Sequence, residues 1–275
     1  MIKLSTKTMR GKMGAGGNSD GTVGKALDVL DAVALAGRPV RFTELLAGSA
    51  YPKATLYRLL QTLTHQGMLA YDRDRQSYSL GMRLVRLAHA AWAQSSIAPL
   101  ARPYIDTLSA DLGETIHLAQ LDVGQVLYVD KRNATRPVEM FSQAGKVGPA
   151  HCTGVGKAML AYLTDTALDR ALDSQSFHRF TGNTLTTRTA LLAELAVIRT
   201  RGFALDAEEH EPGIICVAVP ILTRAERMIG ALSITSTTAR ASLQTLGALA
   251  PRLRHTAALI GAEAESWRFP EQNNG

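Results

Sequence analysis

Cysteine is scarce in this 275-residue chain: Cys152 and Cys216 are too few for the disulfide framework that stabilises small secreted domains. A reducing compartment is therefore expected. No apolar run approaches the roughly 20 residues that a membrane span needs, and the N-terminus lacks the continuous apolar stretch of a signal peptide. These absences argue against a secreted disulfide scaffold and a membrane protein, and they predict a cytoplasmic location.

The sequence also lacks the usual spacing of a metal site. His151, Cys152, His210 and Cys216 are the candidate ligands, but their spacing fits no standard zinc pattern. Neither a metal nor a cofactor is predicted. Aromatic residues make up only 5% of the chain, which disfavours a pocket built for stacking on an aromatic acid. No internal repeat of solenoid length occurs.

Positive charge is concentrated in the first third of the chain. The formal net charge is +6; residues 1–80 contain 11 Lys and Arg against 6 Asp and Glu (+5), whereas residues 81–275 contain 19 against 18 (+1). A basic N-terminal module favours contact with a polyanion such as nucleic acid. A solvated basic surface would have the same composition, so charge alone leaves both interpretations open.

The segment 41–69 has the pattern of a short helix, a tight turn and a second helix. Pro52 fits the first turn of the second helix, where its missing N–H costs nothing. Apolar residues at helical spacing predict a buried stripe at Leu56, Leu59, Leu60 and Leu63. The candidate DNA contacts at the helix start and on its opposite face are Lys53, Ala54, Thr55, Tyr57, Arg58 and Gln61.

A hairpin is predicted directly after this helix. Residues 69–71 and 77–80 have the character of strands, and the polar residues 72–76 form the turn between them. A hairpin in this position is the wing of a winged helix-turn-helix, a module that reads DNA. Arg73 and Arg75 in the turn are expected to contact phosphate groups.

The remaining sequence predicts an antiparallel α+β domain that follows a linker helix. Further helices are predicted at 22–36, 98–112, 153–163, 165–173, 190–201 and 243–265. Strands are predicted at 115–122, 125–131, 138–143, 203–206, 213–222 and 227–236. The predicted domains are a disordered tail at 1–20, a winged helix-turn-helix at 21–81, a linker helix at 82–96, an antiparallel α+β domain at 97–265 and a flexible tail at 266–275.

Several polar residues of this second domain could form a ligand site. Thr153 and Gly154 open a helix, whose first N–H groups suit a carboxylate, although Thr153 could equally be an ordinary N-cap. Ser233 and Thr235 share one face of a strand, which could equally face solvent. Asp206 at a strand end could bind a ligand hydroxyl or cap the adjoining turn.

Several motifs, in order along the chain, resemble the IclR (isocitrate-lyase-regulator) family of bacterial transcription regulators. They are PKATLYRLL at 52–60, YSLG at 78–81, HCTGVGKA at 151–158, RGFALDAEEH at 201–210, GIIC at 213–216 and GALSIT at 230–235. The resemblance covers about residues 21–262. It implies a winged helix-turn-helix, a GAF-like effector-binding domain, a dimeric or tetrameric assembly, operator DNA as partner and a small organic acid as effector. By position, it places the effector at Gly148, Gly154, Val155, Asp206, Cys216, Ser233 and Thr235.

The expected function is therefore a DNA-binding regulator, and not an enzyme, whose operator binding responds to a small acid. Two alternatives remain open from the sequence. A thiol enzyme would use Cys216 or Cys152 as nucleophile, with His151 or His210 as base. A regulator switched by oxidation would need the Cα atoms of the two cysteines within roughly 7 Å of each other.

Overall fold

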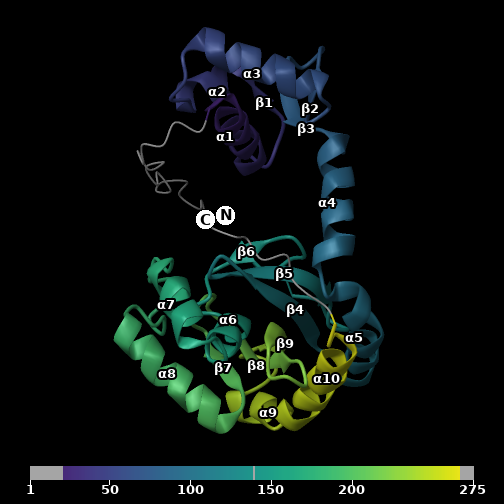
Figure 1. Ribbon diagram of the computed structural model, residues 1–275, viewed down its shortest axis with the longest axis vertical. Helices are drawn as coiled ribbons and strands as arrows, with labels where there is room; N and C mark the ends of the chain where they lie inside the picture. The colour runs from purple at the N-terminus through teal and green to yellow at the C-terminus, as the bar shows by residue number, and fades with distance from the viewer. Residues whose placement is uncertain (1–20, 139, 267–275) are drawn as a thin grey trace. The chain divides into compact units, whose positions relative to one another are not determined.

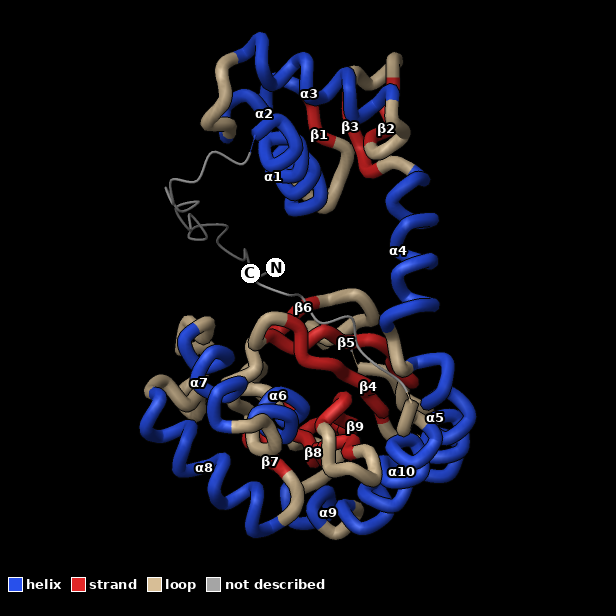
Figure 2. The backbone as a smooth tube through the Cα atoms, viewed as in Figure 1, coloured by secondary structure: helices blue, strands red, loops and turns tan. Residues whose placement is uncertain are grey.

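The computed structural model describes residues 21–138 and 140–266, which form two compact units that meet within one helix, between Ala91 and Trp92. Figure 1 labels the elements, and Figure 2 separates helices from strands by colour. The tails expected at 1–20 and 266–275 lie outside the described residues, apart from Ser266. Each unit has its own hydrophobic core.

The N-terminal unit is a three-helix module with a small sheet. Its elements are α1 (Gly21–Leu35), β1 (Val40–Arg41), α2 (Phe42–Gly48), α3 (Lys53–His65), β2 (Leu69–Asp72) and β3 (Ser77–Leu80). The strands pair antiparallel in the order β1-β3-β2. All four leucines of the predicted stripe in α3 are buried, together with Val29 and Val33 of α1. The helix-turn-helix and its wing therefore form as the sequence predicts.

Two local features of this unit differ from the sequence prediction. Pro52 precedes α3 as its N-cap, with ψ at 148°, and its carbonyl accepts a 3.0 Å hydrogen bond from the N–H of Leu56. The proline thus fixes the entry to the helix instead of lying in its first turn. Strand β1 has only two residues and lacks a strand pattern of its own; pairing with β3 creates it.

Helix α4 (Met82–Ser95) follows the wing, and helix α5 (Ala98–Leu112) begins the C-terminal core. Gly113 ends α5 in the left-handed conformation, with φ at 64°, and the predicted bounds of α5 are confirmed. Leu84 of α4 packs against the N-terminal core, whereas Trp92 packs against the C-terminal core.

The C-terminal unit contains a six-stranded antiparallel sheet in the order β6-β5-β4-β9-β8-β7. Its strands are β4 (Thr115–Asp122), β5 (Gln125–Arg132), β6 (Val147–Gly148), β7 (Ala204–Ala207), β8 (Ile214–Leu222) and β9 (Met228–Thr237). Its other helices are α6 (Gly154–Leu160), α7 (Asp165–Asp173), α8 (Arg188–Arg201), α9 (Leu243–Gly247) and α10 (Ala250–Glu263). The hairpin predicted at 115–131 is confirmed, and its second strand continues to Arg132; its turn places Val123 and Gly124 at positive φ, the conformation of a tight hairpin turn.

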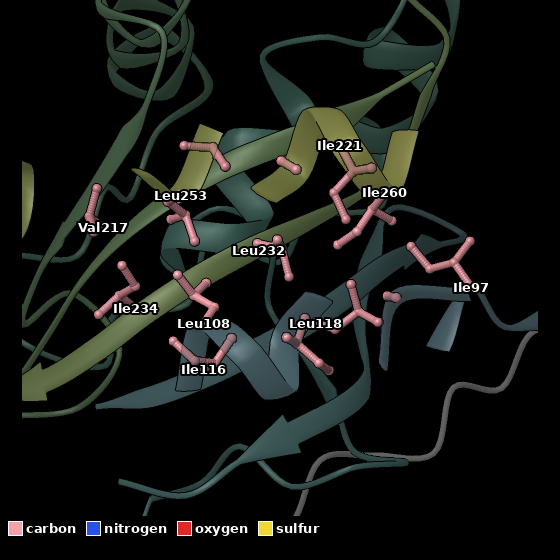
Figure 3. Close-up of a cluster of buried hydrophobic side chains, with 14 of the residues drawn as sticks. Ile97, Leu108, Ile116, Leu118, Val217, Ile221, Leu232, Ile234, Leu253 and Ile260 are labelled. Carbon is pink, nitrogen blue, oxygen red and sulfur yellow. The ribbon is translucent and has the colours of Figure 1, made fainter. Parts of the chain in front are cut away.

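Helices cover both faces of this sheet. On one face, α5, α9 and α10 pack against apolar residues that alternate along the strands, and Figure 3 shows Ile116, Leu118, Leu232 and Ile234 among them. On the other face, α6 packs against β7, β8 and β9, and α8 packs against α6. Side chains along each central strand therefore alternate between the two faces. One set is apolar and packs against α5, α9 and α10, and the other set points to the face that α6 covers.

Two predictions for this unit are wrong. The segment 138–143 forms no strand over its described residues; side chains hold it instead, because the N–H of Phe141 donates to Glu211 and Lys131 Nζ donates to the carbonyl of Ser142. The long helix expected at 243–265 is divided into α9 and α10 near Pro251, which lacks the N–H that a continuous helix needs.

Candidate functional site

The candidate ligand site lies on the sheet face that α6 covers, and strand pairing creates it. Cross-strand partners and residues two apart along a strand share one face of a sheet. One row of such side chains contains Asp206, Cys216, Thr235 and Thr115. The neighbouring row contains Ala204, Ala218, Ser233, His117 and Lys131. Residues that are far apart in sequence thus form one surface beneath α6, which is polar except at Ala204 and Ala218.

Helix α6 approaches this surface through Gly154. A Cβ atom at this position would lie 2.3 Å from Cys216 Sγ, 3.4 Å from Ala218 Cβ and 3.6 Å from Asp206 Cβ. Only glycine leaves room for such a close approach of helix and sheet. The small residues Ala218 and Ala204 in the second row serve the same purpose, since larger side chains would push α6 away.

A small cavity of about 30 Å³ with mixed polar and apolar lining lies between the start of α6 and the sheet. It is lined by His117, Tyr128, Met140, Ser142, Thr153, Gly154, Val155, Asp206, His210, Glu211, Ile214, Cys216, Ser233 and Thr235. Because about 10–15 Å³ is enough for one water molecule by the same measure, this space accommodates little more than two. An organic acid could enter only if lining side chains moved outward.

His117 is the centre of the polar contacts in this cavity. Its Nδ1 lies 3.3 Å from Ser233 Oγ and 3.2 Å from Thr235 Oγ1, and its Nε2 lies 2.7 Å from Ser142 Oγ. Burial and, to a smaller extent, the nearby ammonium of Lys131 lower the pKa of His117 to about 3. The imidazole is therefore neutral at physiological pH, with one N–H donor and one acceptor nitrogen.

A buried group of charges borders the cavity on the side of Asp206. Burial and, to a smaller extent, the neighbouring carboxylate of Glu209 raise the pKa of Asp206 to about 7. The N–H of Glu209, which donates to Asp206 Oδ1 at 2.9 Å, acts in the opposite direction. Lys157 of α6 forms a buried ion pair with Glu209. Asp206 therefore changes its protonation state near neutral pH, so it can accept a hydrogen bond or, when protonated, donate one.

The structure brings together six of the seven residues predicted to bind an effector. Gly154, Val155, Asp206, Cys216, Ser233 and Thr235 all line the cavity. Gly148 does not; it lies in β6, where a Cβ atom would be 3.3 Å from the ring of Tyr128 and 3.6 Å from the ring of Phe141. Its lack of a side chain makes room for these two rings.

The sequence leaves two possible roles open for each of four polar residues, Thr153, Asp206, Ser233 and Thr235. Thr153 does not cap α6 through its side chain, because its hydroxyl donates to the carbonyl of Pro149 at 2.8 Å. Ser233 and Thr235 do not face solvent, since both are buried. Asp206 does cap its turn, through Glu209, and also lines the cavity.

Sequence reasoning missed four residues of the polar lining, which are His117, Tyr128, Ser142 and Glu211, and it considered His210 only as a metal ligand or a catalytic base. The alternation of strand 115–122 places His117 on the less apolar face and is a usable signal for that residue. Ser142 and Glu211 belong to loops that reach the cavity only through tertiary contacts, so no local pattern identifies them.

The two cysteines have the properties of buried apolar groups. Burial raises the pKa of Cys152 and of Cys216 well above the usual value for a thiol. The thiolate, which is the nucleophilic and readily oxidised form, is therefore disfavoured at both positions, and neither thiol alternative is supported. Across the described residues, no cluster of His, Cys, Asp and Glu is arranged to hold a metal ion.

The candidate DNA-binding face belongs to α3 and the wing. Lys53, Ala54, Tyr57, Arg58 and Gln61 are exposed, and Thr55 is half-buried. The Gln61 amide donates to the Tyr57 hydroxyl at 2.9 Å, and the Tyr57 ring packs edge-on against Phe42 of α2. These contacts hold Tyr57 in place on the exposed face.

The wing turn presents its two arginines to solvent. Arg73 and Arg75 are exposed, and Arg75 lies 3.9 Å from Asp72 in a weak surface ion pair. Asp72 Oδ1 accepts hydrogen bonds from the N–H groups of Asp74 and Arg75, which fixes the shape of the turn. The turn is therefore a defined loop with two outward cations.

Comparison with known proteins covers both units. A family model described as IclR helix-turn-helix domain matches residues 22–73, and one described as Bacterial transcriptional regulator IclR C-terminal matches residues 89–262. The chain is 34% identical to the HTH-type transcriptional regulator XynR of Escherichia coli over 219 residues, which are 80% of this chain and 87% of the relative. It is 32% identical to KdgR of Escherichia coli over 233 residues, 85% of this chain and 89% of the relative.

Solved structures show the same architecture. A regulator from Rhodococcus sp. RHA1 aligns with a TM-score of 0.76 at 26% identity, covering 90% of this chain and 99% of the other. An IclR homolog from Microbacterium hydrocarbonoxydans, complexed with 4-hydroxybenzoate, aligns with a TM-score of 0.75 at 22% identity, covering 90% of this chain and all of the other. Among the described residues, no helix has both the length and the apolar character to cross a membrane.

Proposed function

Because the chain belongs to the IclR family of bacterial transcriptional regulators, we propose that it binds a small organic acid between α6 and the sheet, and that this acid modulates its binding to operator DNA. Its relatives are named transcriptional regulators, so the chain is a DNA-binding regulator and not an enzyme. The observation that carries the proposal is the buried cavity, where the start of α6 meets two hydroxyls, an imidazole and a carboxyl group of the sheet.

The effector class follows from these groups. Ser233, Thr235 and the start of α6 can donate hydrogen bonds to a carboxylate, and Asp206 can accept one from a hydroxyl group. A hydroxylated acid or keto acid fits this inventory. The Microbacterium homolog holds an aromatic hydroxy acid, but Tyr128 is the only aromatic ring other than histidine that lines this cavity among the described residues. We therefore favour a sugar acid or a keto acid.

A panel of acids tests this assignment. Thermal-shift measurements on the full chain would use pyruvate, 2-oxoglutarate, gluconate and 4-hydroxybenzoate. A ligand present at 100 times its Kd stabilises the folded state by about 2.7 kcal/mol, which should raise the melting temperature visibly. A response to 4-hydroxybenzoate alone would refute the preference for an aliphatic acid.

The DNA-binding residues are proposed from exposure and chemistry. We expect the exposed residues of α3 to contact base edges, with Arg58 the best candidate for guanine, and Arg73 and Arg75 of the wing to contact phosphate groups. A single module of this size buries little surface, so a two-fold dimer that reads two half-sites is expected.

Exposed apolar side chains support such a dimer. On α1 and α4 they are Val23, Leu27, Leu35, Met82, Val85 and Leu87, each at least half exposed in the single chain. Burial of these side chains against a second copy would remove a large apolar area from water. Light scattering that shows a monomer while the protein still binds DNA specifically would contradict this expectation.

Helix α4 is the covalent connection between the two units, and we propose that it transmits the effector signal. Two dimer geometries would differ in the packing of α4, and the effector would favour one of them. Coupling of about 1–3 kcal/mol is ordinary for such a device, and it is reciprocal. Operator DNA should therefore change effector affinity by the same factor as the effector changes DNA affinity.

A double variant, Ser233→Ala with Asp206→Asn, tests the site. It removes a hydroxyl and a negative charge but keeps an acceptor for the N–H of Glu209. We expect the DNA affinity to stay near wild type without effector and to lose its response to the effector. Ser236→Ala is the matched control, because residue 236 lies on the same strand but on its opposite face. A normal response of the double variant would show that the effector binds elsewhere.

A further inference from the structure

His117 contacts all three serine and threonine hydroxyls that meet in the cavity from β9 and from segment 140–142. It is only 3% exposed and lies directly opposite Ser233 in the pairing of β4 with β9. Both ring nitrogens are engaged, Nδ1 by Ser233 and Thr235 and Nε2 by Ser142. The ring edge also packs against Tyr128, with the ring centroids 5.5 Å apart. The imidazole therefore has little freedom to turn.

The position of the single imidazole proton determines how many hydroxyl hydrogens of Ser233 and Thr235 can donate to a ligand. A proton on Nε2 leaves Nδ1 as an acceptor that consumes one hydroxyl hydrogen, from Ser233 or Thr235. The other hydroxyl can then donate to its neighbour, because the two oxygens are 3.4 Å apart. In that arrangement, at most one of the two hydroxyl hydrogens is left for a ligand, so the site is a poorer receptor for an anion.

A proton on Nδ1 has the opposite consequence. The Nδ1–H group would be shared between the oxygens of Ser233 and Thr235, and both hydroxyl hydrogens would be free to turn towards a ligand. The distances agree with this arrangement, since 3.2 and 3.3 Å are nearly equal and long, as expected for one N–H shared by two acceptors. The 2.7 Å contact of Ser142 with Nε2 is short and suits an O–H donor.

We propose that His117 is a positioning residue that carries its proton on Nδ1, so that Ser233 and Thr235 direct both hydroxyl hydrogens at the carboxylate of the effector. Ser142 donates to Nε2 and keeps the proton on the other nitrogen. The proposal rests on the proposed effector site, but the proton position is a property of the protein without ligand. Lys131 lies on the same face beside His117, and its positive charge disfavours a second proton on the ring.

Nitrogen-15 NMR of the full chain with labelled histidine tests the proton position without any effector. One histidine should show a protonated Nδ1 and an unprotonated Nε2, with signals that do not change between pH 5 and 9. The same signals should be missing from the His117→Asn variant, which assigns them. A proton on Nε2, or titration of this ring within that pH range, would overturn the proposal.

Two variants test the consequence for binding, with pyruvate and gluconate as probes. In His117→Asn the amide N–H can replace Nδ1–H, whereas in His117→Gln the amide reaches towards the position of Nε2. We expect His117→Asn to bind the responding probe nearly as wild type and His117→Gln to bind it about tenfold more weakly, the effect of about one lost hydrogen bond. Equal loss in both variants would indicate a merely structural role and refute the proposal.

The NMR experiment and the binding experiment test different parts of the proposal. If neither probe binds the wild-type protein, the proposed effector class is wrong, whereas the NMR result still decides the proton position. If a probe binds and the proton lies on Nε2, the effector site stands and the role assigned to His117 is wrong.

Discussion

Replacement of Gly154 by alanine should disrupt the candidate site through one steric contact. The added Cβ atom would lie 2.3 Å from Cys216 Sγ, whereas its other close neighbours, at 3.4 and 3.6 Å, are ordinary contacts. Non-bonded heavy atoms prefer a separation of about 3.5–4.0 Å, so helix α6, β8 or the Cys216 side chain must move by more than about 1 Å. Overpacking of this kind typically costs about 1–3 kcal/mol.

The second variant in this test is Cys216→Ala, which removes the sulfur atom that the new methyl group meets. Alone it should destabilise the protein modestly, by about 1 kcal/mol, because it leaves a small void. Combined with Gly154→Ala it should be less harmful than the sum of the two changes, with a favourable coupling of about 1–2 kcal/mol. The methyl group would then occupy part of the space that the sulfur leaves.

Urea unfolding followed by tryptophan fluorescence is a suitable assay, because Trp92 packs against the core of the C-terminal unit. Effector response should be lost in Gly154→Ala and partly restored in the double variant, while ligand-free DNA affinity stays unchanged in all three proteins. If Gly154→Ala is as stable as wild type, or if the two changes are simply additive, the close approach of α6 to the sheet is not what requires glycine.

Other changes test the charged residues. Arg58→Ala should cost about 1–3 kcal/mol at one operator position in competition binding, whereas Arg73→Ala should weaken all sequences alike and reduce the salt dependence of DNA binding. The pKa of Asp206 is raised to about 7, so between pH about 4 and 7 the folded protein binds one proton more than the unfolded chain. The stability of the wild type relative to Asp206→Asn should therefore fall as pH rises through that window, and it should be constant above it. Lys157→Met should destabilise the protein by about 3–5 kcal/mol, because Glu209 then remains buried without its cation; adding Glu209→Gln should recover much of this loss in urea unfolding.

Local signals in the sequence were sufficient for most of the secondary structure. The leucine spacing in α3, the glycine that ends α5 and the Val123–Gly124 turn each act within a few residues, and the structure confirms all three. Local signals failed where contacts distant in sequence decide the backbone. Segment 138–143 looks like a strand, yet hydrogen bonds to Glu211 and from Lys131 hold it as a loop.

The candidate ligand site shows the same division. The sequence by itself determined that Ser233 and Thr235 share a face, because a strand alternates with a period of two, and the family resemblance placed six residues that the structure brings to one cavity. Only the tertiary structure decided which residues join them. The register of β4 against β9 sets His117 opposite Ser233, and register depends on the packing of the whole sheet rather than on any short segment.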